Sequence, residues 1–142
     1  MAKTQMTLGR VDIVDLPDLG IENIPAKIDT GAYRSSLHCK NVHLDGKTLK
    51  FTLITEEGAQ EYTTDRWKEK SIRSSNGKAE TRFVIKTTIR IFGKNYQASM
   101  SLTDRSKMKN PILIGRKLLS NKFLVDVSQE NLSFQQKQST NQ

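Results

Sequence analysis

The chain lacks disulfides, long apolar segments and an N-terminal signal core. Its single cysteine, Cys39, cannot form a disulfide within the chain, which favours a reducing compartment. No apolar run approaches the roughly 20 residues that a membrane-spanning helix needs. The first residues, MAKTQMTLGRVDIVD, contain no hydrophobic signal segment. We therefore expect a cytoplasmic protein that does not enter a membrane.

Aromatic residues are also scarce, whereas basic residues outnumber acidic ones. Phe, Trp and Tyr make up 6% of the chain and are not interleaved with its lysines and arginines. This pattern does not favour a platform on which nucleic-acid bases stack, so a nucleic-acid partner is not expected. The formal net charge of +8 instead suggests attraction to an acidic protein or peptide.

Side chains that would hold a metal or a nucleotide are few. Zinc hydrolases need about three protein ligands, and the candidates here are His38, Cys39 and His43. The pairs Gly77-Lys78 and Gly93-Lys94 lack the spacing of a phosphate-binding loop. We therefore predict no metal site and no cofactor.

Short alternating segments separated by turns fill most of the sequence. From residue 81 to residue 92 every second side chain lies on one largely apolar face, as in a half-buried strand. Asp45-Gly46 and Asn76-Gly77 are strong hairpin signals. Helical character is confined to residues 115–120. The pattern predicts an all-β barrel or sandwich, with one domain over residues 1–127 and a polar, flexible tail over residues 128–142.

Two segments carry the chemistry that the sequence suggests. In the first, an apolar strand ends at Ile28 and continues into Asp29-Thr30-Gly31-Ala32, which presents one carboxylate on a glycine-containing turn. In the second, the apolar strand Ile112-Leu113-Ile114 meets Gly115-Arg116 and a helical turn. Asp-Thr-Gly alone would be an ordinary turn, but the combination predicts that the two segments meet in the fold.

These residues resemble those of single-domain retropepsin-like aspartic proteases. In that family the Asp-Thr-Gly-Ala loop carries the catalytic carboxylate, a hairpin flap follows, and an apolar strand before Gly-Arg packs behind the loop. The matching runs here are Asp29-Thr30-Gly31-Ala32, the flap Ser74-Ser75-Asn76-Gly77, and Ile112-Leu113-Ile114-Gly115-Arg116. The resemblance implies a closed barrel of the acid-protease type with one short C-terminal helix.

A narrower resemblance covers about Leu8 to Val127. The chain is similar to the bacterial RimB or RimK-associated proteases, also labelled ATP-dependent zinc proteases, through five runs in the same order: LPDLG, AKIDTGAYRSSLHC, RSSNGKAETRFVIKT, SLTDRSKMKNPILIGRKLL and FLVDVS. The long interval between Ile28 and Ser74 predicts an added hairpin over residues 42–66. The small number of zinc ligands and the lack of a nucleotide loop argue against the label.

The resemblance also implies a mechanism. Acid–base peptide hydrolysis needs two carboxylates that share one proton, and the chain contains one Asp-Thr-Gly. A twofold-related copy must supply the second, which implies a homodimer with catalytic Asp29 from each subunit. Thr30 hydroxyls would link the two loops, the Gly31 N–H would point at the carboxylates, residues 113–116 would support them, and the flap would close over an extended peptide.

Some positions depart from the family pattern. Retroviral enzymes carry an acidic residue where this chain has Tyr33, so Arg116, which pairs with that acid, needs another partner. Lys27 and Arg34 flank the loop and are candidate substrate-binding residues for an acidic peptide. The RimK-associated proteins are associated with ligases that add glutamates to protein tails, so the resemblance suggests polyglutamate-type substrates.

Two other functions are compatible with the sequence. The first is a catalytically silent, peptide-binding regulator associated with a glutamate ligase, and the separation of two Asp29 carboxylates would distinguish it. The second is a metal-dependent hydrolase, which metal analysis with and without His38→Ala would distinguish.

Overall fold

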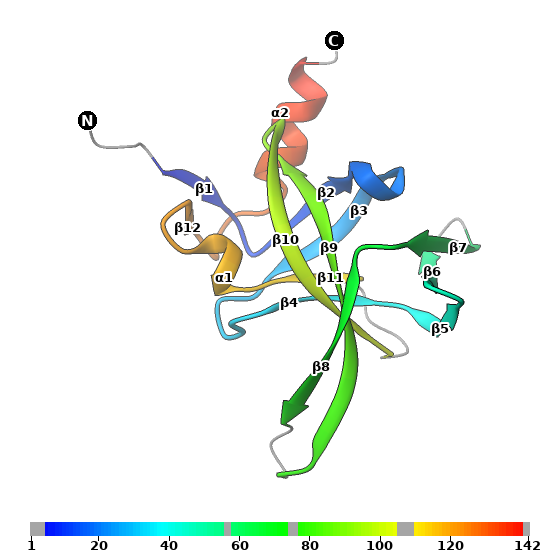
Figure 1. Cartoon of the computed structure of the whole chain (residues 1–142). Helices are drawn as coiled ribbons and strands as arrows, with labels where there is room; N and C mark the ends of the chain where they lie inside the picture. Colours follow the sequence, from blue (N-terminus) through cyan, green and yellow to red (C-terminus); the bar gives the residue numbers. More distant parts are fainter. Residues whose placement is uncertain (1–4, 56–57, 74–76, 105–109, 141–142) are drawn as a thin grey trace.

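The computed structural model describes residues 5–55, 58–73, 77–104 and 110–140, and strands make up most of them (Figure 1). In chain order the strands are β1 (Met6–Leu8), β2 (Val11–Leu16), β3 (Ile21–Ile28), β4 (Ser35–His38), β5 (Lys40–Asp45), β6 (Thr48–Thr55), β7 (Gly58–Thr64), β8 (Trp67–Arg73), β9 (Ala79–Ile91), β10 (Lys94–Thr103), β11 (Ile112–Ile114) and β12 (Phe123–Val125). The helical segments are η1 (Pro17–Leu19), α1 (Arg116–Leu119) and α2 (Leu132–Thr140). None of these helices is long and apolar enough to cross a membrane.

The main sheet closes into a barrel. Its strands follow the order β10-β4-β11-β3-β2-β9, and β9 also pairs with β10, which completes the ring. β8 pairs with β9 and extends the sheet beyond this ring. The predicted all-β closed barrel is therefore confirmed, and α1 is the short helix expected after β11.

β11 lies between the two strands that are joined by the Asp29 loop. It runs parallel to β3, with Ile114 opposite Ile28, and antiparallel to β4, with Ile112 opposite Leu37. The chain therefore leaves β3, passes the carboxyl end of β11 and returns on its other side. This topology brings the two sequence segments singled out above into contact, as predicted.

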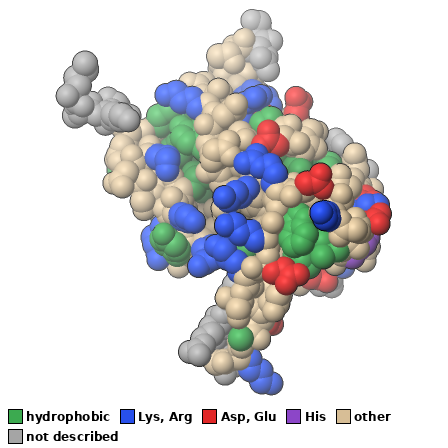
Figure 2. Space-filling view, in the orientation of Figure 1, with side chains coloured by type: hydrophobic (Ala, Val, Ile, Leu, Met, Phe, Trp, Pro, Cys, Tyr) green, Lys and Arg blue, Asp and Glu red, His purple; other side chains and the backbone are tan. Residues whose placement is uncertain are grey.

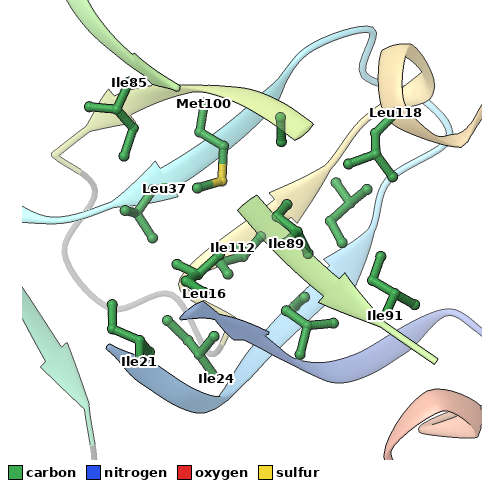
Figure 3. Close-up of a cluster of buried hydrophobic side chains, with 14 of the residues drawn as sticks. Leu16, Ile21, Ile24, Leu37, Ile85, Ile89, Ile91, Met100, Ile112 and Leu118 are labelled. Carbon is green, nitrogen blue, oxygen red and sulfur yellow. The ribbon is translucent and has the colours of Figure 1, made fainter. Parts of the chain in front are cut away.

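Apolar side chains fill the barrel (Figure 3). The alternation along β9 places Ile85, Ile89 and Ile91 in this core, where each is fully buried. Ile112 of β11 and Leu118 of α1 belong to the same cluster. Because α1 shares this core, the turn from β11 into α1 is fixed relative to the barrel.

A second, three-stranded antiparallel sheet contains β5, β6 and β7. It occupies the region of the hairpin predicted over residues 42–66. Phe51 and Leu53 of β6 are buried and join the main core cluster. The Trp67 indole N–H donates to the Lys47 carbonyl at 2.9 Å, which anchors this sheet to the start of β8.

β8 and β9 form the long arm in which the flap was predicted. The two strands pair from Trp67 opposite Ile85 to Arg73 opposite Ala79, and the arm projects away from the barrel (Figure 1). Ser74, Ser75 and Asn76 lie outside the described residues. Gly77 is exposed with φ of 82°, a left-handed conformation that glycine adopts without steric cost.

The end of the chain differs from the polar, flexible tail expected over residues 128–142, because residues 132–140 form helix α2 against β2. The Asp12 carboxylate of β2 accepts the backbone N–H groups of Ser133 at 2.9 Å and Phe134 at 3.1 Å. The first N–H groups of a helix have no partner inside the helix, so this buried carboxylate satisfies them. Lys137 also donates to both Asp15 oxygens at 3.0 Å. These partners lie far away in the sequence, which explains why the local composition did not indicate a helix.

Candidate active site

Asp29 stands where β3 ends, beside the end of β11. Its backbone N–H donates to the carbonyl of Ile114 at 2.8 Å, which continues the pairing between the two strands by one residue. The side chain is half-buried. The residue therefore has a position fixed by the barrel while its carboxylate stays accessible.

Gly31 turns the chain back toward this carboxylate. Its N–H donates to Asp29 Oδ1 at 3.1 Å, and the Ala32 N–H donates to the Asp29 carbonyl at 3.2 Å. A Cβ at position 31 would lie 3.3 Å from Asp29 Oδ1, closer than most side-chain carbons approach an oxygen. Glycine thus allows the backbone donor to reach the acid.

Gly115 joins the end of β11 to the returning part of the same loop. A Cβ at this position would lie 2.6 Å from the Arg34 carbonyl oxygen and 2.7 Å from that of Tyr33, distances that a real side chain does not adopt. The Gly115 N–H donates to the buried Ser35 hydroxyl oxygen at 3.1 Å. Close backbone contact at this point therefore requires glycine.

The first turn of α1 holds the middle of the loop. The Arg116 N–H donates to the Ala32 carbonyl at 2.9 Å, and the Lys117 N–H donates to the Tyr33 carbonyl at 2.8 Å. These donors begin a helix and have no partner within it. The loop carbonyls satisfy them, so the loop and α1 form one hydrogen-bonded unit.

Arg116 binds a partner other than an acidic side chain, as the sequence required. Its guanidinium Nη1 donates to the Thr30 carbonyl at 3.0 Å, and its Cζ lies 6.0 Å from the centre of the Tyr33 ring. A cation over an aromatic face is attracted by the ring. Arg116 therefore binds the loop although Tyr33 stands where retroviral enzymes carry an acidic residue.

The remaining predicted site residues are less closely joined. Ile114 is buried behind Asp29, while Leu113 is half-buried and lies opposite Lys27 and Ser36. Lys27 and Arg34 are both exposed, and Arg34 lines a recess of the surface together with Lys70 of β8. The roles assigned to all these residues, and to Asp29 and Thr30, stay predictions.

Sequence reasoning missed Ser35, whose hydroxyl receives the Gly115 N–H. Its position directly after the loop, at the start of a strand, was the available signal. It also missed that Arg34 would lie near lysines of other strands, because only closure of the barrel brings those strands together.

The candidate metal ligands have other surroundings. The Cys39 thiol is buried, and this burial together with nearby Asp104 raises its pKa to about 12, so it stays protonated at neutral pH. His38 Nδ1 lies 2.7 Å from the Thr103 hydroxyl, and exposed His43 Nδ1 lies 2.7 Å from the Asn41 carbonyl. In the part of the chain that the structure describes, no three His, Cys, Asp or Glu side chains are grouped as metal ligands would be.

A closed all-β barrel that presents Asp-Thr-Gly at a strand end, bound to a strand and a short helix, defines the retropepsin-like class of proteins. Residues 7–136 match the sequence model of the RimB-like family, described as retropepsin-like aspartic endopeptidase RimB. The chain belongs to this family.

Curated relatives carry a different description. The chain is 31% identical over 140 residues to a probable alpha-L-glutamate ligase of Shewanella pealeana, with 91% of this chain and 30% of the relative covered. A protein of the same description from Desulfotalea psychrophila is 29% identical over 130 residues, with 84% and 27% covered. The chain thus spans less than a third of the length of these relatives.

A solved structure supports the fold. A protein of unknown function from Legionella pneumophila superposes with a TM-score of 0.75 at 24% identity, covering 92% of this chain and 99% of the other. At this identity the likeness shows the barrel architecture and nothing about activity.

Proposed function

We propose that this chain is an aspartic peptidase that acts as a homodimer, with the Asp29 carboxylates of two copies facing each other across the twofold axis. The family description supports peptidase chemistry. The requirement for a second copy comes from the single Asp-Thr-Gly in the chain. Symmetric pairing supplies the missing carboxylate from the same surface of the partner.

The proposed chemistry uses one shared proton. Two carboxylates about 3 Å apart cannot both ionise, so one is protonated. The ionised one removes a proton from water as the water oxygen bonds to the peptide carbonyl carbon, and the protonated one donates its proton to the carbonyl oxygen. Collapse of the resulting diol breaks the C–N bond, and the leaving amine takes up a proton.

The observation that carries this proposal is the way the chain holds Asp29. One N–H from Gly31 points at the carboxylate, while hydrogen bonds to β11 hold the start of the loop and hydrogen bonds to α1 hold its middle. A group fixed before the substrate arrives needs little rearrangement during the reaction, which favours catalysis. An ordinary exposed turn would not require so many specific contacts.

Other predicted residues would complete the site. Thr30 is exposed beside Asp29, so its hydroxyl is available to bind the partner loop across the axis. Leu113 and Ile114 would exclude water from behind the carboxylates. The arm formed by β8 and β9 would close over an extended peptide, which is the role predicted for the flap residues Ser74, Ser75, Asn76 and Gly77.

For the substrate we propose acidic, polyglutamate-type protein tails. Two observations support this choice: the net charge of +8, and the glutamate-ligase descriptions of the relatives. A ligase that adds glutamates and a peptidase that removes them would act on the same chemical group, and the region similar to this chain makes up less than a third of each relative.

The test uses purified protein and a fluorescence-quenched peptide that ends in several glutamates. Wild type should cleave it, Asp29→Asn should not, and analytical ultracentrifugation should show a dimer for both. Cleavage that survives in Asp29→Asn would rule out the aspartic mechanism. Peptide binding without cleavage by a wild-type dimer would instead support a silent regulator.

A further inference from the structure

An open groove of about 330 Å³ lies on the outer face of the barrel, next to α1. Residues of β9, β10, α1 and the start of β4 line it. Its lining includes Ser35, Ala98 and Ser99 and four basic residues: Arg66, Lys86, Lys117 and Lys122. Figure 2 shows Lys and Arg side chains gathered in the middle of this face.

A smaller recess continues the groove toward the candidate active site. The two share Ser35, Ser99 and Lys117, and the recess adds the basic residues Arg34 and Lys70. Arg34 ends the Asp29 loop and Ser35 begins β4. The basic surface therefore starts at the loop that carries Asp29 and extends along the outside of the barrel. We call the groove and the recess together the basic groove. Its six basic residues are Arg34, Arg66, Lys70, Lys86, Lys117 and Lys122.

Acidic side chains neutralise little of this charge. Among the described residues, Arg66 is the member of the basic groove with a carboxylate within salt-bridge distance, Asp18 at 3.8 Å. The pKa of Lys70 is lowered, first by the charge of Arg34, then by partial burial, and further by Lys117 and nearby lysines. Like charges thus repel one another here, and an anion would relieve that repulsion.

The shape and lining of the basic groove restrict the kind of anion. Its lining contains no aromatic side chain among the described residues, so nucleic-acid bases would have nothing to stack on. β10 pairs with β9 along the groove, with Ala98 opposite Thr87, and it also pairs with β4 from Met100, which lies opposite both Ile85 and Ser35. The lining offers an acidic ligand the charged ends of lysine and arginine side chains, so the carboxylates of the ligand should make the main contacts.

We propose that the basic groove is a binding site for an acidic stretch of polypeptide, separate from the site of bond cleavage. Lysine and arginine side chains bind the carboxylates of successive Glu or Asp residues. The segment passes beside Arg34 and continues along α1. The biological purpose of this binding rests on the proposed function, because the basic groove would hold an acidic tail near Asp29. The binding itself requires no catalysis.

The experiment measures binding of fluorescein-labelled octaglutamate by fluorescence anisotropy at low and high salt. All proteins carry Asp29→Asn, which prevents cleavage. The groove variant adds Lys86→Gln and Lys117→Gln, which remove charge but leave backbone bonds in place. Lys47→Gln, with the same charge change per residue in the exposed turn between β5 and β6, is the matched control.

The double substitution should weaken binding about tenfold, as expected for the loss of two exposed charge contacts, and Lys47→Gln should change it less than about twofold. Added salt should weaken binding of the parent more than that of the groove variant. Unchanged melting temperatures would exclude a folding defect.

Three results would overturn the proposal. The first two are equal affinities of parent and groove variant, and no saturable octaglutamate binding by the parent. The third is displacement of the labelled octaglutamate by an eight-nucleotide oligothymidylate at lower concentration than by unlabelled octaglutamate, which would assign the groove to nucleic acid. Cleavage separates this proposal from the peptidase one. Groove-dependent binding with an inactive wild type keeps the groove and rejects the peptidase. Cleavage with an unchanged KM after Lys86→Gln and Lys117→Gln are introduced into the wild type, which retains Asp29, does the reverse.

Discussion

Asp12 and Asp29 are both aspartates that accept backbone N–H groups, but the chain surrounds them differently. Asp12 lies on β2, is 1% exposed, and accepts the N–H groups of Ile13, Ser133 and Phe134. Asp29 is half-buried at the end of β3 and, among the described residues, accepts one N–H, from Gly31.

The difference separates an acid with a structural role, Asp12, from the acid for which we propose a chemical role, Asp29. A carboxylate offers about four acceptor positions, and the chain occupies three of those on Asp12, two of them with N–H groups of helix α2. On Asp29 most acceptor positions stay available. Burial raises the pKa of Asp12, and the three N–H groups oppose that rise only in part. The acceptor positions of Asp12 are mostly occupied by its own chain, whereas those of Asp29 can accept hydrogen bonds from a partner, water or substrate.

Exchanging each carboxylate for an amide should separate peptide cleavage, which depends on Asp29, from stability, which depends on Asp12. Asp29→Asn should reduce peptide cleavage by about a thousandfold or more, because the amide cannot take part in proton transfer. Asp12→Asn should leave cleavage per folded molecule unchanged. Both are measured with the quenched glutamate peptide at equal concentrations of folded protein. Loss of cleavage in Asp12→Asn with α2 intact would contradict this division.

Gly115→Ala tests whether the precise position of the Asp29 loop matters. The new Cβ would push against the Tyr33 and Arg34 carbonyls, costing about 1–3 kcal/mol of stability and reducing cleavage about a hundredfold through displacement of the loop. Gly31→Ala, with a less severe 3.3 Å contact, should destabilise less. Urea unfolding and the cleavage assay measure the two effects. Wild-type cleavage by folded Gly115→Ala would show that the loop position is unimportant.

Removing the Asp12 carboxylate should loosen α2. Asp12→Asn places an NH2 group where one carboxylate oxygen accepts a backbone N–H, so a donor faces a donor, and we expect a loss of about 1–3 kcal/mol in the free energy of unfolding. Hydrogen exchange should become faster at Ser133 and Phe134 before it does in the barrel. Lys137→Met, which removes the ion pair to Asp15, serves as an independent way to weaken the same helix. Unchanged exchange in both variants would contradict the docking role.

The smallest expected effect is a difference in pH dependence. The pKa of Asp12 is raised, so its contribution to stability is greatest below its ordinary value of 3.8 and declines as pH rises through the raised pKa. The pKa of Asp126 is lowered by the Ser128 hydroxyl first, then by Gln129 and the Ser128 N–H. Its contribution is present above 3.8 and is lost as pH falls through the lowered pKa.

Unfolding free energies of wild type, Asp12→Asn and Asp126→Asn between about pH 2 and pH 7 measure these contributions. The advantage of wild type over Asp12→Asn should grow toward low pH, while its advantage over Asp126→Asn should shrink. The same trend in both variants would show that burial does not dominate at Asp12.

The parts of the fold that the sequence predicted are those that depend on local patterns. Alternation along residues 81–92 predicts a strand whose apolar side chains face the core, and β9 has this arrangement. The contact between the Asp29 loop and Gly115 was predicted because each segment has a recognisable pattern of its own. The partner of Arg116 was not, because it is a backbone carbonyl, and any residue at position 30 has one.

The parts that were missed depend on contacts between distant segments. Helix α2 has a polar sequence with little sign of a helix, and it is held by Asp12 and Asp15, which belong to the other end of the chain. The basic groove likewise draws Lys70, Lys86 and Lys117 from separate elements. Spacing along a sequence does not show that such residues will lie together.

The most direct test of a site shared by two subunits is cleavage by mixtures of wild type and Asp29→Asn, exchanged to equilibrium at constant total concentration. If each site needs Asp29 from both subunits, an equal mixture should retain about one quarter of the wild-type activity, the fraction of dimers with two intact copies. If each subunit acts alone, the mixture should retain about one half, and that result would contradict the account.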